Sequence, residues 1–264
     1  MTMADLGPDG RPCAIVLSFD NLGEASELER GTWDQRVRLG HHESVTVALP
    51  RLLDELDALD LVGTFFVEAL NCKLYPQALH EIADRGHELG VHGWRHEAWA
   101  QLSPERERDL LLRAGRAFRS LGLQTQAFRP PGGQPTVATR PLLRELGYLW
   151  WSPAVGSEGL GDGPATIPFD WELVDAYHLM ERFAQARVRR GDSRAPLPPA
   201  VVGDRLCVDL ATASGTQVLI LHPFLMLDSL WWESVRGVLA LIAQLTRERQ
   251  AWTGPGGALT EAGR

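Results

Sequence analysis

The sequence predicts an α/β protein, a single-domain barrel of β/α units with a largely parallel sheet. Short apolar runs alternate with helical patterns along the chain, an arrangement typical of βα units. The 264 residues are enough to bury one large core, and α/β barrels of this length are usually one domain. The sequence contains no internal repeat, low-complexity tract or linker that would divide it.

Seven apolar runs have the length and composition of buried strands. They are Ala14–Phe19, Gly63–Val67, Glu88–Val91, Gln126–Arg129, Tyr148–Trp151, Ala165–Phe169 and Val218–Leu221. The helical patterns between and after them are Ser44–Leu59, Tyr75–Arg85, Pro104–Leu121, Thr139–Leu146 and Trp231–Arg249. Seven strands with intervening helices predict a barrel, in which reactive groups lie at the C-terminal ends of the strands.

The helix Pro104–Leu121 has the clearest start signal in the sequence. Ser103 can cap its first turn, and Pro104 suits the first helical position. Glu105 and Glu107 follow, where the positive end of the helix dipole favours acidic side chains. Apolar residues then recur at helical spacing, which predicts one buried face.

Three segments fall outside this pattern. Residues 187–200, rich in Arg and Pro, are predicted to form a solvated connecting loop; a mobile lid is the rarer alternative. Residues 1–12 are predicted to be a flexible N-terminus and residues 251–264 a flexible C-terminal tail. The barrel domain is therefore expected to span residues 13–250.

Charge and cysteine usage exclude several classes of protein. A net charge of −8 argues against a nucleic-acid partner, because phosphate binding needs clustered positive charge. The sequence has no signal-like apolar run near its start and no apolar stretch long enough to span a membrane. Cys13, Cys72 and Cys207 are scattered and are interpreted as free thiols of a reducing compartment. We expect a cytoplasmic protein with a small-molecule partner and no membrane partner; a homo-oligomer stays an open alternative.

Polar clusters follow five of the predicted strands. They are Asp20-Asn21, His92 to His96, Arg129 to Gly133, Asp170-Trp171 and His222-Pro223. The C-terminal ends of barrel strands meet at one rim, so these clusters are predicted to form one site.

Each cluster suits a step of metal-assisted hydrolysis. His92 and His96, four residues apart in one turn, can present two imidazoles to a divalent cation. Asp20 could accept a proton from a water molecule, and His222 could protonate a leaving nitrogen. Arg129 can hold a carboxylate bidentately. Taken singly, each residue also has a structural interpretation as a cap, a hydrogen-bonded histidine or a surface ion pair; their common order on strand ends favours a site.

These residues resemble the motifs of the polysaccharide deacetylase family, also called chitooligosaccharide-deacetylase-like proteins or family four carbohydrate esterases. The matching segments are Ser18-Phe19-Asp20-Asn21 for T-F-D-D, His92 to His96 for H-[ST]-x-x-H, Arg129-Pro130-Pro131 for R-x-P-[YFW], and Leu219 to His222 for L-x-L-H. The resemblance runs from about Ala14 to Pro223 and also includes Thr64 to Val67 and Gly86 to Glu88.

The resemblance implies a distorted (β/α)7 barrel that hydrolyses an N-acyl amide. By this similarity Asp20 is the catalytic base, His222 the general acid and Arg129 the residue that orients Asp20. His92 and His96 are implied metal ligands, together with the residue at position 21. The backbone N–H of the residue after Pro130 is implied to lie near the oxyanion.

The sequence departs from the family pattern at the metal site. The second aspartate of the first motif is Asn21, whose amide oxygen can ligate a cation but has no charge. Glu24, one turn on, could supply the missing carboxylate or could face solvent. Zinc is the first expectation for the metal, with cobalt, nickel or manganese as alternatives.

Two further departures from the family pattern concern the substrate and the residue that orients the general acid. Gly93 replaces the Ser or Thr of the second motif, and this H-G-W-R turn resembles the allantoinase and cyclic-imide hydrolase branch of the family. In place of an evident fourth motif, Asp170 and Asp175 are equal candidates to orient His222 or to cap the following helix.

The sequence therefore predicts a metal-dependent amidohydrolase that removes an N-acyl group from a small intracellular amine or amino sugar. A cyclic amide or ureide hydrolase of the same fold is the second hypothesis, and a catalytically silent binding module is the third. The substrate pocket is expected to include Trp94, Pro131, Trp171 and Glu24.

Overall fold

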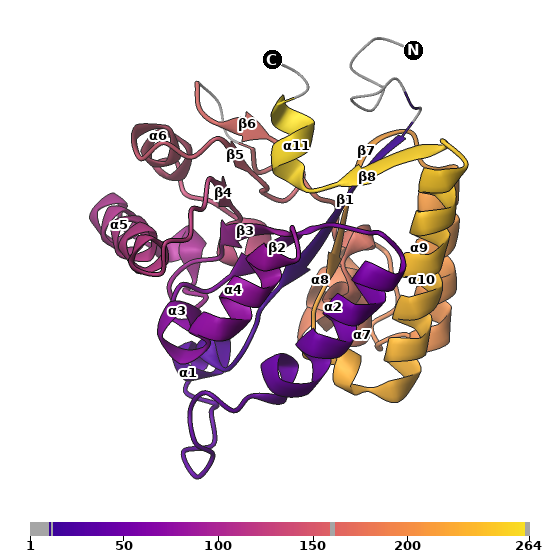
Figure 1. Ribbon diagram of the computed structural model, residues 1–264, viewed down its shortest axis with the longest axis horizontal. Helices are drawn as coiled ribbons and strands as arrows, with labels where there is room; N and C mark the ends of the chain where they lie inside the picture. The colour runs from indigo at the N-terminus through magenta and orange to yellow at the C-terminus, as the bar shows by residue number, and fades with distance from the viewer. Residues whose placement is uncertain (1–10, 12, 159–161, 262–264) are drawn as a thin grey trace.

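The computed structural model describes residues 11, 13–158 and 162–261, and a curled parallel sheet lies at its centre (Figure 1). The strands are β1 (Cys13–Asp20), β2 (Thr64–Val67), β3 (Glu88–Val91), β4 (Ala127–Phe128), β5 (Trp150–Trp151), β6 (Ala165–Thr166), β7 (Gly215–Leu221) and β8 (Ala251–Gly254). The sheet order is β6-β5-β4-β3-β2-β1-β7, and β8 pairs with β1. All of these pairings are parallel, as expected for βα units.

Helices cover the sheet on both flanks (Figure 1). The α-helices are α1 (Ala25–Arg30), α2 (Leu49–Ala58), α3 (Asn71–Leu74), α4 (Pro76–Asp84), α5 (Pro104–Ser120), α6 (Thr139–Glu145), α7 (Asp175–Leu179), α8 (Ala184–Arg189), α9 (Pro199–Thr212), α10 (Ser229–Arg247) and α11 (Gly256–Glu261). The tighter or wider turns are η2 (Ser44–Ala48), η3 (Trp99–Gln101), η4 (Pro131–Gly133), η5 (Trp171–Leu173), η6 (Glu181–Phe183) and η7 (Leu225–Leu227). Among the helices of the described residues, none combines the length and the apolar composition needed to cross a bilayer.

Two isolated bridges bring the ends of the sheet towards each other. Ala154 pairs with Phe169, and Val174 pairs in parallel with Ile220 of β7, so the segment after β6 returns to the other end of the sheet order. The result is a distorted, incompletely hydrogen-bonded barrel in one domain, which confirms the predicted fold class. Its strand ends are where the chain places its polar clusters.

The first strand is buried along its whole length, in keeping with the continuous apolar run CAIVLSF. β7 pairs with it from Cys13 to Phe19, and this pairing occupies one edge of β1. β8 pairs with Cys13–Val16 and β2 with Ser18–Asp20, so these two strands share the other edge. The strand that ends in Asp20 is therefore held by backbone hydrogen bonds on both sides.

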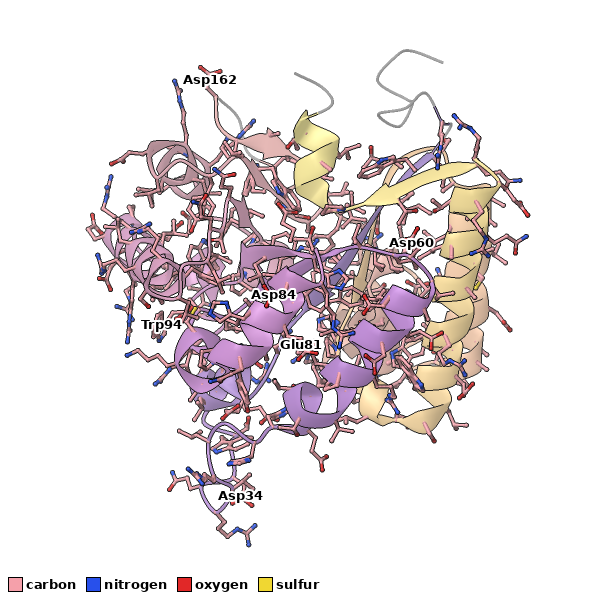
Figure 2. The ribbon with its side chains drawn as sticks, viewed as in Figure 1. Asp34, Asp60, Glu81, Asp84, Trp94 and Asp162 are labelled. Atoms are coloured by element: carbon pink, nitrogen blue, oxygen red, sulfur yellow. The ribbon has the colours of Figure 1, made fainter. Side chains whose placement is uncertain are left out.

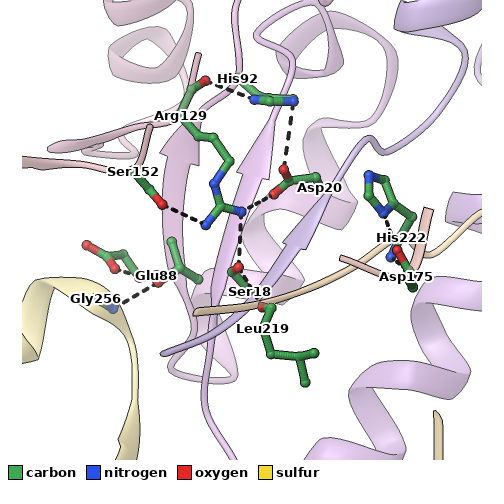
Figure 3. Close-up of polar contacts among 11 residues, drawn as sticks. Ser18, Asp20, Glu88, His92, Arg129, Ser152, Asp175, Leu219, His222 and Gly256 are labelled. Carbon is green, nitrogen blue, oxygen red and sulfur yellow. Dashed lines mark hydrogen bonds and ion pairs between the residues drawn. The ribbon is translucent and has the colours of Figure 1, made fainter. Parts of the chain in front are cut away.

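The expected flexible tail, residues 251–264, instead contains β8 and α11 over its described part. The Pro255-Gly256-Gly257 run suggests flexibility, but it serves a close contact. A Cβ on Gly256 would lie 2.3 Å from the Trp150 ring, so glycine is needed there. The Gly256 and Gly257 amides donate to Thr64 and Glu88 at 3.1 Å each, which fixes the turn (Figure 3 draws Gly256 and Glu88). The flexible N-terminus expected over residues 1–12 lies outside the described residues apart from Arg11.

The predicted loop over residues 187–200 is shorter than expected and is anchored. α8 continues to Arg189, and α9 begins at Pro199. Arg187 is buried and donates to the carbonyl oxygens of Tyr177, Met180, Ser193 and Arg194 at 2.5–3.0 Å. The connection is thus tied to α7 by one guanidinium group.

Helix α9 was not predicted, because its apolar residues are spread around the helix. Val202, Leu206 and Leu210 are buried one turn apart, whereas Val201 and Val208 are exposed. This distribution blurs the single apolar stripe that predicts an amphipathic helix. The long loop after α1 projects from the same end of the barrel as α1, with Asp34 near its tip (Figure 2).

Candidate active site

A cavity of about 280 Å³ lies at the C-terminal ends of the strands, and we call it the main cavity. Its lining residues are Asp20, Asn21, His92, His96, Arg129, Pro130, Gly132, Gly133, Phe169, Trp171, Val174, Arg182, Phe183, Ile220 and His222. The expected base, acid, arginine and cation-binding residues are all among them, as is Trp171. Each polar member except Arg182, which lies on η6, ends or follows a strand, which is why residues far apart in sequence meet here.

Asp20, the last residue of β1, is held by Arg129 after β4 (Figure 3). Arg129 Nη1 lies 2.6 Å from Asp20 Oδ1 and 3.0 Å from Ser18 Oγ, and Nη2 donates to Ser152 Oγ at 3.1 Å. The guanidinium also stacks over the Phe66 ring at 4.2 Å. Burial lowers the pKa of Arg129 from its ordinary value, and the adjacent Asp20 opposes this effect. The ion pair with Arg129 fixes Oδ1 of Asp20 and thereby sets the direction in which Oδ2 points.

His222, which follows β7, is held by Asp175 at the start of α7 (Figure 3). Its Nδ1 lies 2.5 Å from Asp175 Oδ1, and its backbone N–H donates to Asp175 Oδ2 at 2.8 Å. Asp175 Oδ1 also accepts from the Ala176 amide at 2.6 Å, and the carboxylate is fully buried. An acceptor on Nδ1 places that proton on Nδ1, so Nε2 is the nitrogen left for a ligand in the cavity.

Asp170 has a different role from Asp175, although the two were equal candidates in the sequence. Asp170 accepts from the Glu172 amide at 3.0 Å and so caps η5. It also pairs with Arg190 at 2.7 Å on the surface. The residue that orients His222 is therefore Asp175.

His92 and His96 lie side by side in the turn after β3, with ring centroids 4.9 Å apart. His92 Nδ1 lies 2.9 Å from the Arg129 carbonyl oxygen and donates to it, which leaves Nε2 with a free lone pair. Burial lowers the pKa of His92 to about 3 and that of His96 well below its ordinary value. Both imidazoles are therefore neutral at pH 7, the state in which histidine ligates metals.

Asn21 lines the same cavity as His92 and His96. The residue is buried in a left-handed backbone conformation with φ 60°, and within the described part of the chain its Oδ1 has no hydrogen-bond partner. An unpartnered buried oxygen on a residue that shares a cavity with two neutral imidazoles fits a divalent cation of borderline hardness. Among the described residues, no three His, Cys, Asp or Glu side chains group closely enough to hold a metal alone. The donor set that fits is Asn21, His92 and His96.

Comparison with known proteins gives the family. A model of the polysaccharide deacetylase family matches residues 14–151, which is more than half of the chain. The chain belongs to the polysaccharide deacetylase family. The deacetylases of this family cleave carbon–nitrogen bonds other than peptide bonds, so the enzyme class expected from the sequence is that of the family.

Three similar proteins illustrate the range of the family fold. A peptidoglycan deacetylase of Helicobacter pylori is 28% identical over 105 residues, which cover 39% of this chain and 36% of that protein. A Mycobacterium smegmatis protein provisionally assigned as a polysaccharide deacetylase has a TM-score of 0.82 at 26% identity, covering 99% of this chain and 93% of that one. PuuE allantoinase has a TM-score of 0.72 at 15% sequence identity, and the match covers 97% of this chain and 92% of that one. This likeness shows a shared fold. The matched segments span 27% to 51% of the length of the curated relatives.

Two residues expected in the substrate pocket, Trp94 and Glu24, do not line the main cavity of this protein. Trp94 is buried on the flank of the barrel, where the Arg113 guanidinium stacks on its ring at 3.7 Å (Figure 2). Glu24 is fully buried and accepts from the Tyr75 hydroxyl at 2.6 Å and the Gly40 amide at 2.7 Å. It therefore neither faces solvent nor supplies a carboxylate to the cavity.

The turn after Arg129 also differs from the expectation. Pro131, expected in the pocket, is buried and does not line the cavity. As a proline it has no N–H, so the amide implied to lie near the oxyanion cannot be its own. Gly132 and Gly133 follow with φ of 72° and 76° and do line the cavity. The Gly133 amide already donates to the Pro130 carbonyl at 2.8 Å, which leaves Gly132 as the amide of this turn to consider.

Sequence reasoning missed Glu68, a fully buried carboxyl after β2. Neither of its oxygens makes a hydrogen bond within the described part of the chain. Burial raises the pKa of Glu68 well above its ordinary value, and the charges of Asp20 and Glu97 add to this effect. The signal was present, because an acidic residue directly after the buried run Phe65-Phe66-Val67 falls on the same rim as Asp20.

Proposed function

We propose that this protein is a metal-dependent amidohydrolase that removes an N-acyl group from a small amine or amino sugar. The observation that supports it best is that Asp20 and His222 line one cavity and that each is held by a buried charged partner. Arg129 holds Asp20, and Asp175 holds His222. A base and an acid placed on one bound amide are what hydrolysis needs. The small volume of the cavity favours a small ligand over a polymer chain that must be gripped along its length.

The residues perform complementary steps. Asp20 accepts a proton as the oxygen of water attacks the acyl carbon, and Arg129 holds the carboxylate in position. His222 Nε2 then donates a proton to the nitrogen as the C–N bond of the tetrahedral intermediate breaks. Asp175 fixes the tautomer of His222 and stabilises the imidazolium form. A divalent cation held by Asn21, His92 and His96 would lower the pKa of water and polarise the acyl carbonyl.

The experiment is a release assay for free amine on a panel of N-acetyl amines, amino sugars and their oligomers, with metal analysis of the same protein. We expect turnover of small members, near-stoichiometric divalent metal after reconstitution, and a loss of about 10²- to 10⁴-fold in kcat for Asp20→Asn. Asp84→Asn, which removes an exposed carboxylate at the end of α4, is the matched control and should retain wild-type turnover.

Two results would separate the alternatives. Only trace metal, with activity indifferent to chelators, would refute the metal-dependent reaction. Unchanged turnover in Asp20→Asn would refute the assignment of the base.

A cyclic amide or ureide hydrolase is the second candidate. Gly93 favours it, because its backbone has a φ of 76°, a left-handed conformation that the Ser or Thr of the deacetylase motif would adopt only with strain. Hydrolysis of hydantoin- or imide-type rings in preference to linear N-acetyl amines would establish this candidate. The cytoplasmic location and the intracellular origin of the substrate stay predictions.

A further inference from the structure

A second cavity of about 280 Å³ adjoins the main cavity, and we call it the arginine cavity. Its lining residues are Asn21, Gly23, Ser26, Glu27, Arg30, His42, Met180, Arg182, Phe224 and Leu227. Asn21 and Arg182 line both cavities, so a ligand could extend from one into the other. α1 supplies one side of the arginine cavity, and the segments around η6 and η7 supply the other.

Two arginines face this space without an acidic partner. Arg30 Nη2 donates to Ser26 Oγ at 3.0 Å, and within residues 11, 13–158 and 162–261 neither Arg30 nor Arg182 forms an ion pair. Glu27 lines the same cavity, and its Oε2 lies 3.6 Å from His42 Nε2. The cavity therefore contains two guanidinium groups whose charges are not matched by a neighbouring carboxylate contact.

The positive charges of Arg30 and Arg182 also affect the neighbouring candidate metal site, at His96. Both side chains keep access to solvent; partial desolvation lowers the pKa of Arg182, the positive charge of Arg30 contributes to this shift, and the Asp175 carboxylate opposes it. Both arginines also contribute, after burial and His92, to the lowered pKa of His96. Two like charges that line one cavity repel each other, and a bound anion would offset that repulsion.

The remaining wall of the arginine cavity is partly apolar. Met180, Phe224 and Leu227 line it. A ligand that fits both features has an anionic group joined to the amide through a short apolar segment. Guanidinium groups bind carboxylates through paired, charge-assisted hydrogen bonds, so a carboxylate is the natural anion.

We propose that the substrate has a carboxylate group that Arg30 and Arg182 bind in the arginine cavity while its amide lies between Asp20 and His222. This inference rests on the proposed amide hydrolysis and narrows its substrate class from neutral amino sugars to anionic N-acyl or ring amides. Arg182 is then a specificity-determining residue rather than a part of the proton transfer.

The test compares substrate pairs that differ only by one carboxylate. N-acetylmuramic acid, N-acetylphenylalanine and hydantoin-5-acetic acid are each paired with the carboxamide made from their own carboxylate. We expect wild-type kcat/KM to favour the acid by about 10- to 100-fold, mainly through KM, because one charge-assisted contact has about this effect. Arg182→Gln and Arg30→Gln should each remove most of the preference. Arg116→Gln, an exposed arginine on α5, is the matched control and should keep it.

Calorimetric titration of the same acids and their neutral partners separates this inference from the proposed function. If amides are hydrolysed without acid preference, or with a preference that both variants keep, the carboxylate site is refuted and the hydrolase stands. If nothing is hydrolysed but an acid binds more tightly than its neutral partner, and Arg182→Gln abolishes the difference, the carboxylate site stands and the hydrolase fails. Equal binding of acids and neutral partners refutes the site.

Discussion

The two sides of the main cavity differ in how completely the protein satisfies its own polar groups. On the proton-transfer side, Asp20 and His222 each have charged or hydrogen-bonded partners at 2.5–2.8 Å. On the cation side, Asn21 Oδ1 has no partner among the described residues, and His92 Nε2 has Asp20 Oδ2 at 3.9 Å as its nearest acidic atom. The first side is organised by the chain alone, whereas the second leaves donor atoms for a ligand.

The largest effect should come from breaking the proton-transfer side at Asp175. Asp175→Asn keeps the shape but removes the carboxylate that stabilises the imidazolium form of His222, the form in which Nε2 has a proton to donate. We expect kcat on the best amide substrate to fall about 10²- to 10⁴-fold and the pH profile to change shape.

Asp170→Asn is the matched control for this change, because Asp170 caps η5 and pairs with Arg190 on the surface, whereas Asp175 is the carboxylate bonded to His222. Steady-state kinetics across pH 5–9, with circular dichroism to verify folding, give the measurement. Equal kcat for Asp175→Asn and wild type would show that the contact with His222 is only structural.

A smaller effect should follow from adding charge to the cation side. Asn21→Asp gives this side the carboxylate that the family motif has, so divalent metal affinity should rise at least about tenfold. Without metal, a new buried carboxylate near Asp20 should lower the melting temperature. Competition with a zinc-responsive dye and melting curves with and without chelator measure both changes. Asn21→Ala, which removes the amide oxygen, should weaken metal binding; affinities that do not depend on this side chain would exclude position 21 as a ligand.

The smallest effect concerns Glu68, a further unpartnered group beside Asp20. The pKa of Glu68 is raised in the folded protein, whereas a glutamate in the unfolded chain has a pKa of about 4.3. Above that pH the folded state therefore keeps a proton that the unfolded state has lost. Wild-type stability should therefore fall as pH rises from about 4.3 towards the raised pKa, by up to about 1.4 kcal/mol per pH unit. Glu68→Gln should remove this decline, measured as the free energy of unfolding in urea at pH 5, 6.5 and 8. The exposed Glu43→Gln should retain the wild-type slope, and parallel curves for all three proteins would contradict the interpretation.

The sequence predicted the fold and the strand-end residues because both depend on local patterns. Apolar runs between helical segments indicate βα units, and a polar residue directly after such a run must lie at the rim, as Asp20, Arg129 and His222 do. Glu68 obeys the same rule and could have been predicted. The choice between Asp170 and Asp175 could not, since each precedes a helical turn and the sequence does not give the distance to His222.

The incorrect predictions for Trp94, Glu24 and the C-terminal tail share a physical cause. Trp94 and Glu24 follow strands in sequence, yet their side chains turn away from the cavity, towards Arg113 in one case and Tyr75 in the other. Spacing gives the position of a residue along an element and says little about direction in an irregular turn. Gly256 suggested a flexible tail because glycine is common in mobile segments. Here its small size instead allows contact with Trp150, which only the tertiary structure reveals.

The double pairing of β1 has a consequence for how the enzyme could diversify. Asp20, the proposed base, ends a strand that has hydrogen-bonded neighbours along both edges, so its position is set by a constrained backbone. Arg182 lies instead on η6, a single turn of three residues on the outer rim. Mutations can therefore move or replace the specificity arginine without displacing the base, and a new substrate preference can evolve while the chemistry is kept.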